Sequence, residues 1–145
     1  MPRTQSTRSP VALYVHIPFC SHRCHYCDFN TYEGQGDLHG PYVDALVANI
    51  ETWSRRAAKL PVATSVFFGG GTPSLLAPSE LARILGAVRA NIGVADGAEV
   101  TVEVNPETMN EEVFGALLGA GFNRVSIGVQ SLVSQVLAGL GRTHS

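Results

Sequence analysis

The chain has 145 residues, of which 45% are apolar and 15% charged, and its formal net charge is −2. This length suits about one domain, and the composition excludes a disordered chain. The basic residues are scattered, so the sequence predicts neither nucleic acid nor an anionic membrane as a partner. No apolar run approaches the roughly 20 residues of a membrane-spanning helix. Residues 1–11 lack a signal-peptide core and are expected to form a disordered polar tail of a cytoplasmic protein.

Strand-like and helical patterns alternate along the rest of the chain. Runs rich in β-branched and aromatic residues predict strands at 12–19, 64–70, 99–106 and 124–131. Each run is followed by apolar residues at helical spacing. The first helix would bury Val43, Leu46, Val47, Ile50 and Trp53, and the second Leu81, Ile84, Leu85 and Val88. Four alternations predict an α/β fold with a parallel sheet and right-handed crossovers.

Residues near the helix ends support these boundaries. Pro41 suits the first turn of a helix, because that turn does not need its missing N–H. Asn110 is a plausible N-cap before an acidic first turn, and Gly121 suits the end of the same helix.

The alternation of side chains along the strands predicts a polar face. In the third strand Val100, Val102 and Val104 share one face, which leaves Glu103 on the other. The same period places Tyr14 and Gln130 with Glu103 near the carboxyl ends of their strands. Such a face suits the interior of a barrel that holds a ligand. The alternative is an open doubly wound sheet, in which these residues would be hydrogen-bonded beneath a helix.

The length allows only part of a barrel. A complete eight-stranded (β/α) barrel takes about 250 residues, and four βα units supply half of its strands. We therefore expect residues 12–145 to form the N-terminal part of a TIM-like barrel, with the remainder and a C-terminal domain absent from this chain.

All three cysteines, Cys20, Cys24 and Cys27, lie within eight positions. An odd number at such close spacing does not suit a disulfide framework, and thiolates bind zinc or iron–sulfur clusters. Three thiolates would leave one iron of a 4Fe-4S cluster without a protein ligand. That iron could bind another ligand through nitrogen and oxygen atoms. The alternatives are three unrelated thiols or a Cys3His zinc site. The fourth zinc ligand would be His16, His22 or His25.

The run GGGTPS begins at Gly69, directly after the second predicted strand. Glycines let a ligand approach the main chain closely, and the freed N–H and C=O groups can bind the charged ends of an amino acid. No lysine follows, so a nucleotide triphosphate site is not indicated.

The motifs YVHIPFC, CHYCDF, GGGTPS, VEVNPE, IGVQS and LGRTH extend from about Ala12 to His144. Together they resemble the oxygen-independent coproporphyrinogen III oxidase-like family of the radical S-adenosylmethionine superfamily. The resemblance implies a radical-SAM core domain and a 4Fe-4S cluster held by the three cysteines. It also implies S-adenosylmethionine contacts from Tyr14, Gly70, Gly71, Thr72, Glu103, Gln130 and Arg142. For Arg142, a solvated cation at a helix end is the alternative.

Phe29 distinguishes two branches of that family. The oxidases resemble this chain but carry a further cysteine two residues past the third cluster cysteine, where this chain has Phe29. The stretch CDFNTY instead resembles the heme chaperone branch, which implies heme as cargo and acceptor proteins such as respiratory enzymes as partners. The alternative is the oxidase itself, in which a radical derived from S-adenosylmethionine leads to decarboxylation of a porphyrinogen. Many relatives have proline in place of His25, and no heme ligand can be named from this segment.

Overall fold

The computed structural model describes residues 10–56, 62–142 and 144, so most of the expected polar tail lies outside the described residues. Four parallel strands form one sheet in the order β1 (Val11–Ile17), β4 (Ala63–Gly70), β5 (Val94–Val104) and β6 (Arg124–Ile127). The helices are α1 (His39–Arg56), α2 (Pro78–Asn91), α3 (Glu111–Ala120) and α4 (Ser134–Gly139). Short 3-10 turns lie at Gly36–Leu38, Pro73–Leu75 and Pro106–Thr108. The predicted parallel α/β fold is confirmed.

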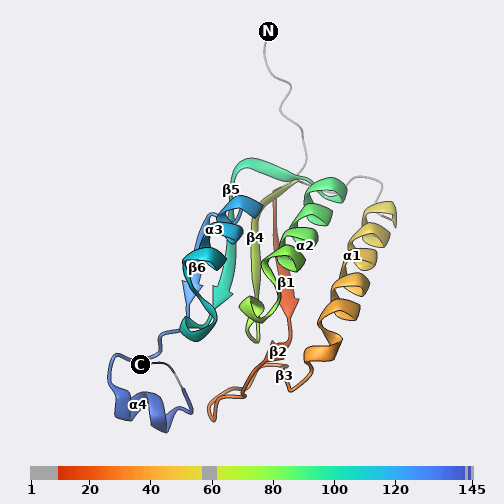
Figure 1. The fold of residues 1–145 in the computed structure, drawn as a ribbon. Coiled ribbons are helices and arrows are strands. Elements are labelled where there is room, and N and C mark those ends of the chain that lie inside the picture. The colour runs from red at the N-terminus through yellow and green to blue at the C-terminus, as the bar shows by residue number, and fades with distance from the viewer. Residues whose placement is uncertain (1–9, 57–61, 143, 145) are drawn as a thin grey trace.

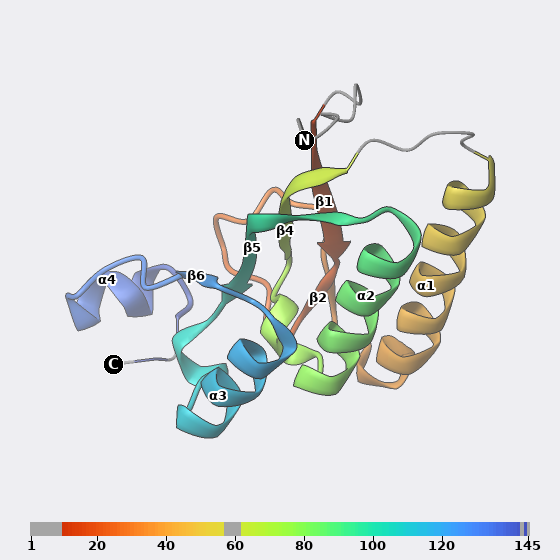
Figure 2. The same cartoon turned by 90° about the horizontal axis from the view of Figure 1, so that it is seen from above.

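The arrangement of layers is that of a barrel segment. Strand order follows chain order without a reversal, and α1, α2 and α3 lie along one side of the sheet (Figures 1 and 2). A doubly wound sheet would reverse its strand order and carry helices on both faces. The predicted partial barrel therefore describes these strands better than the open-sheet alternative.

The core lies between the sheet and these helices. Phe68 and Val102 are completely buried on the helix side of their strands, and the ring of Phe68 meets that of Phe122 edge to face at 5.0 Å. The apolar face predicted for α2 is confirmed, since all four of its residues are buried. The prediction for α1 is wrong at its end, because Trp53 is 63% exposed.

The predicted caps of α3 are confirmed. Asn110 accepts a hydrogen bond from the Val113 N–H through its side chain at 2.9 Å. Gly121 ends the helix in the left-handed conformation, with φ of 99°. Both residues satisfy main-chain groups that the helix itself leaves unpaired.

Two predicted strand boundaries are wrong by more than two residues. β5 begins at Val94, before the predicted start, and β6 already ends at Ile127. Gln130 therefore lies beyond the strand and has a φ of 65°, so it is not placed by strand alternation. A four-residue strand followed by a turn cannot be separated from a longer strand by apolar alternation alone.

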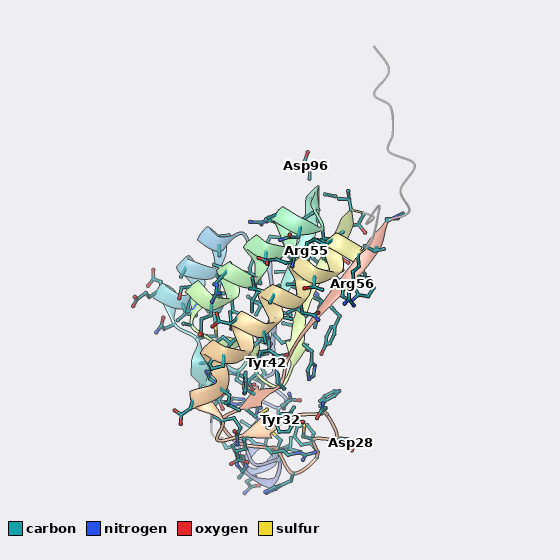
Figure 3. All side chains as sticks on the ribbon, turned by 90° about the vertical axis from the view of Figure 1, so that its right-hand side faces the viewer. Asp28, Tyr32, Tyr42, Arg55, Arg56 and Asp96 are labelled. Atoms are coloured by element: carbon teal, nitrogen blue, oxygen red, sulfur yellow. The ribbon has the colours of Figure 1, made fainter. Side chains whose placement is uncertain are left out.

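Loops gather where the parallel strands end. The two-residue strands β2 (Phe19–Cys20) and β3 (Tyr32–Glu33) pair there in parallel. Figure 3 shows Asp28 and Tyr32 at this end of the molecule and Asp96 at the opposite end. Within the described ranges, no helix combines the length and the apolar character needed to cross a bilayer.

Candidate cluster and cofactor site

A cavity of about 310 Å³ opens at the carboxyl ends of the strands. Parallel strands all end at this edge, so loops from distant parts of the chain meet there. The structure brings every predicted site residue except Tyr14 to the lining of this cavity. Those residues are Cys20, Cys24, Cys27, Gly70, Gly71, Thr72, Glu103, Gln130 and Arg142.

The three thiols are free and partly exposed, and each has a different polar neighbour. The Thr72 hydroxyl lies 4.0 Å from Cys20 Sγ, and the Thr31 hydroxyl lies 3.9 Å from Cys27 Sγ. Arg142 Nη1 donates to Cys24 Sγ at 3.6 Å. Every thiol therefore has a neighbour that can donate a hydrogen bond to a thiolate.

Burial raises the pKa of the Cys20 thiol above its usual range. Hydrogen bonds from Thr72 and Thr31 oppose this rise, while the nearby Cys27 and Cys24 add to it. A thiolate is the form that binds a metal, and a bound metal cation would favour it. The protein without metal thus keeps this thiol protonated at pH values where a bound cation would hold it ionised.

The glycine loop packs against the segment that leads into the cysteines. The Gly71 N–H donates to the Ile17 carbonyl at 2.8 Å, and the Thr72 N–H donates to the Phe19 carbonyl at 2.7 Å. A Cβ on Gly71 would lie 2.5 Å from the Phe19 carbonyl oxygen and 2.9 Å from Cys20 Sγ. Only glycine fits this approach without displacing the backbone beside the first cysteine.

These hydrogen bonds also restrict what the loop offers a ligand. The Gly70 N–H donates to Glu103 Oε2 at 3.2 Å, so the N–H groups of 70–72 all have partners. A ligand at this loop would therefore meet carbonyl oxygens rather than free N–H groups, and carbonyl oxygens suit an ammonium group. Of the two groups that the sequence suggested for this role, the structure favours C=O over N–H.

Tyr14 lies beside Glu103 rather than in the cavity wall. A Cβ on Gly69 would come within 2.8 Å of Glu103 Oε2 and 3.1 Å of Tyr14 Cε2, so both side chains adjoin this glycine. Burial raises the pKa of the Tyr14 phenol, and the negative charge of Glu103 adds to the rise. Strand alternation therefore placed these two residues correctly relative to each other.

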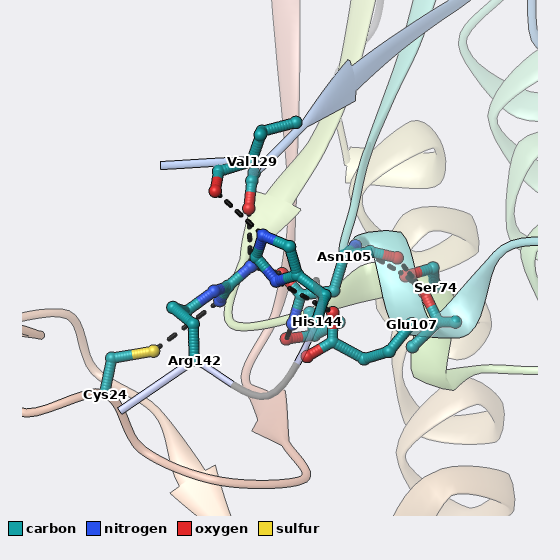
Figure 4. Close-up of polar contacts among 10 residues, drawn as sticks. Cys24, Ser74, Asn105, Glu107, Val129, Arg142 and His144 are labelled. Atoms are coloured by element: carbon teal, nitrogen blue, oxygen red, sulfur yellow. Dashed lines mark hydrogen bonds and ion pairs between the residues drawn. The ribbon is translucent and has the colours of Figure 1, made fainter. Parts of the chain in front are cut away.

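Arg142 binds three parts of the site at once (Figure 4). Its guanidinium donates to Asn105 Oδ1 at 2.9 Å, to the Gly128 carbonyl and to Cys24 Sγ. The alternative of a solvated helix-end cation is therefore wrong. Arg142 Nε is buried and has no hydrogen-bond partner among the described residues.

Sequence reasoning missed Asn105 and assigned no cofactor role to Tyr26, although both line the cavity. Asn105 follows the last residue of β5, and its side chain reaches both Arg142 and the Thr72 hydroxyl. Its position immediately after a strand was a usable signal, because barrel sites are built from such residues.

The histidines near the cysteines already have other contacts. His16 bonds Tyr14 through one ring nitrogen and the Asn30 carbonyl through the other, and His22 Nδ1 lies 3.6 Å from Glu33 Oε1. No group of three or more His, Cys, Asp or Glu side chains is close enough to hold a single metal ion in the described part of the chain. The Cys3His zinc alternative has no geometric support there.

A family model described as the radical SAM superfamily matches residues 14–145. The chain belongs to the radical SAM superfamily. Curated relatives include two named heme chaperone HemW. One, from Mycobacterium tuberculosis, is 46% identical over 94% of this chain and 35% of its own length. The other, from Escherichia coli, is 43% identical over 93% of this chain and 36% of its own length.

A further relative, from Danio rerio, is named radical S-adenosyl methionine domain-containing protein 1, mitochondrial. It is 46% identical over 92% of this chain and 30% of its own length. The solved structure of coproporphyrinogen III oxidase (HemN) from Escherichia coli, described as a radical SAM enzyme, superposes with a TM-score of 0.86. That match has 32% identity and covers 95% of this chain and 32% of the oxidase. The chain thus spans about a third of the length of each of these radical SAM relatives.

Proposed function

We propose that the whole protein is a heme chaperone that binds a 4Fe-4S cluster, S-adenosylmethionine and heme, and delivers heme to acceptor proteins. Similarity to proteins named heme chaperone HemW, at 43% and 46% identity, is the observation that carries the proposal. The chain covers only about a third of those relatives, so heme binding and transfer are proposed for the whole protein.

The donor set fits a cluster. Three free thiols line one cavity, and each has a neighbouring hydroxyl or guanidinium that can donate to a sulfur. We assign Cys20, Cys24 and Cys27 as the cluster ligands. When bound, a 4Fe-4S cluster with one open iron supplies electrons to S-adenosylmethionine, and this chain supplies the surrounding polar groups.

The polar groups of the cavity suit an amino-acid cofactor. Carbonyl oxygens of Gly70 and Gly71 would accept from its ammonium group, and the guanidinium of Arg142 would donate to an anionic end. Glu103 would accept from hydroxyl or ammonium groups. Thr72, Gln130 and Tyr14 complete the proposed contact set, with Tyr14 acting from its place beside Glu103.

A second candidate function is oxygen-independent coproporphyrinogen III oxidation. The close superposition on HemN favours it, with a TM-score of 0.86. Phe29 favours the chaperone instead, because an apolar ring lines the cavity where the oxidase pattern has a further cysteine. Whether the protein is an enzyme therefore depends on whether porphyrinogen is turned over at this site.

The proposal includes a reducing compartment, the cytoplasm, because free thiols persist there and cluster assembly needs them. One relative is named mitochondrial, so the comparisons do not fix the compartment, and the cytoplasm is proposed. Respiratory enzymes are the proposed kind of acceptor, since they use heme.

Anaerobic reconstitution of the whole protein tests both functions together. We expect close to four irons per chain, heme binding in a spectroscopic titration and transfer of that heme to an apo-acceptor. Cys24→Ala should lose the cluster, because two thiolates rarely retain one. Stoichiometric zinc in place of iron would refute the cluster. Protoporphyrinogen formed with S-adenosylmethionine and a low-potential reductant, above the Cys24→Ala control, would favour the oxidase.

A further inference from the structure

Two of the three cysteines are linked by a continuous series of side-chain contacts that passes through one residue, Asn105. Asn105 Nδ2 donates to Thr72 Oγ1 at 3.2 Å, and the Thr72 hydroxyl donates to Cys20 Sγ at 4.0 Å. On its other side, Asn105 Oδ1 accepts from Arg142 Nη2 at 2.9 Å, and Arg142 Nη1 donates to Cys24 Sγ. The series joins segments that are far apart in the sequence.

The amide of Asn105 has the chemistry that this position needs. Its carbonyl oxygen accepts from a cation, and its NH₂ group donates to a hydroxyl oxygen. The hydroxyl then has its own proton free to point at Cys20. A carboxylate at this place could accept from the cation but could not donate to the hydroxyl. An apolar side chain could do neither.

The main chain holds Asn105 firmly. Its N–H donates to Ser74 Oγ at 3.3 Å, and its carbonyl accepts from Thr108 Oγ1 at 2.8 Å. Figure 4 shows Asn105 between Ser74 and Arg142, with Cys24 on the far side of the arginine. The backbone at the end of β5 therefore fixes the amide, and the amide fixes both sulfur donors.

We propose that Asn105 is a positioning residue that sets the reduction potential and the retention of the cluster. It does so by orienting Thr72 toward Cys20 and Arg142 toward Cys24. Donors to ligand sulfurs stabilise the extra negative charge of the reduced cluster, so the oriented pair makes reduction easier. This inference rests on the proposed cluster at the three cysteines.

Two substitutions in the whole, reconstituted protein test the inference. Asn105→Leu removes both side-chain hydrogen bonds, so we expect a more negative reduction potential and about tenfold faster loss of iron to a chelator. Asn105→Asp keeps the size and the acceptor for Arg142 but turns the Thr72 hydroxyl away from Cys20. We expect a negative shift there as well, measured by redox titration followed by electron paramagnetic resonance.

Asn123, which directly precedes β6, offers a matched control outside the lining of the cavity. Its side chain also bridges two main-chain groups, accepting from the Val100 N–H at 2.8 Å and donating to the Ala98 carbonyl at 2.9 Å. Asn123→Leu should lower the melting temperature but leave the reduction potential unchanged. A merely structural role for Asn105 would give the same result as this control.

The outcomes separate the inference from the function it rests on. A wild-type protein that takes up no cluster would refute the proposed function itself. A wild-type cluster whose potential and iron retention are unchanged in both Asn105 variants would overturn the role of Asn105 alone. If Asn105→Leu does not fold, the same-sized Asn105→Asp decides by its potential. A potential that shifts in the Asn105 variants and stays constant in Asn123→Leu would support the inference.

Discussion

The helix-covered face of the sheet and the carboxyl ends of its strands are completed in different ways. On the covered face, apolar side chains such as Phe68 and Val102 fill the space and leave no exposed fraction. At the strand ends, free thiols and the Arg142 side chain line a cavity, and Arg142 Nε has no hydrogen-bond partner within the described part of the chain. Apolar side chains thus fill the space between the sheet and its helices, whereas the strand ends keep polar groups around a cavity.

The largest loss of stability should come from truncating a side chain in the core between the sheet and the helices. Phe68→Ala removes a completely buried ring and leaves a cavity, so the free energy of unfolding should fall by about 3–5 kcal/mol. Urea denaturation of the whole protein measures it. Trp53→Ala is the control, since its exposed side chain should change stability by no more than about 0.5 kcal/mol. Equal losses in both variants would contradict the core described above.

Glu103→Ala tests the strand ends instead. Loss of a charged acceptor should weaken S-adenosylmethionine binding by about 1.5–3 kcal/mol while the cluster stays in place. Anaerobic calorimetry on the cluster-loaded protein measures the affinity, and iron analysis checks the cluster.

The matched variant Glu103→Gln keeps an acceptor for the Gly70 N–H and removes only the charge. An intermediate affinity would assign the effect to the charge of Glu103. Unchanged affinity in both variants would show that this residue does not contact the cofactor, although it lines the cavity.

The same contrast explains what could be predicted from the sequence. The buried face of α2 and the alternation in β5 follow from apolar periodicity, which is a local property of the chain. Local patterns also placed Tyr14 next to Glu103. They failed for Trp53, because helical spacing alone does not tell which residues of a helix a neighbouring element covers.

The strand ends were less predictable for a physical reason. The backbone of Gln130, with its positive φ, and the bonds of Asn105 to Arg142 depend on loops that meet only in the folded chain. The periodicity of apolar residues carries no information about contacts between distant loops. The cysteines were the exception, because their spacing alone indicates a shared ligand, and their assignment as cluster ligands stays a prediction.

Tyr42→Phe tests a contact that joins the two regions. The Tyr42 hydroxyl on α1 donates to the His16 carbonyl at 2.6 Å, near the end of β1. Removing it should reduce the free energy of unfolding by about 0.5–1.5 kcal/mol, as denaturant titration would measure.

The pH dependence of that loss sharpens the test. Burial raises the pKa of Tyr42, and the neighbouring Tyr14 adds to the rise. A raised pKa means that the folded protein keeps the phenol proton when the unfolded chain has lost it. The stabilising effect is therefore complete below about pH 10 and is lost as pH rises through the folded pKa. Phe has no such proton, so a difference between wild type and variant that persists at the highest pH would contradict this account.

Phe29→Cys should have the smallest effect on folding and is the sharpest test of the strand ends. The ring of Phe29 is 69% exposed at the cavity, so its loss should change stability by no more than about 0.5 kcal/mol. The substitution restores the thiol of the oxidase pattern. We still expect no protoporphyrinogen from coproporphyrinogen, because turnover also needs the substrate held in a reactive position by residues outside this segment.

The product assay would use S-adenosylmethionine, a low-potential reductant and the cluster-loaded whole protein. Phe29→Ser is the control of equal size without a thiol, and Cys24→Ala gives the background without a cluster. Turnover in Phe29→Cys alone would mean that one side chain at the cavity separates chaperone from oxidase. The strand ends would then already contain the remaining groups for catalysis, because a single added thiol cannot by itself position a porphyrinogen.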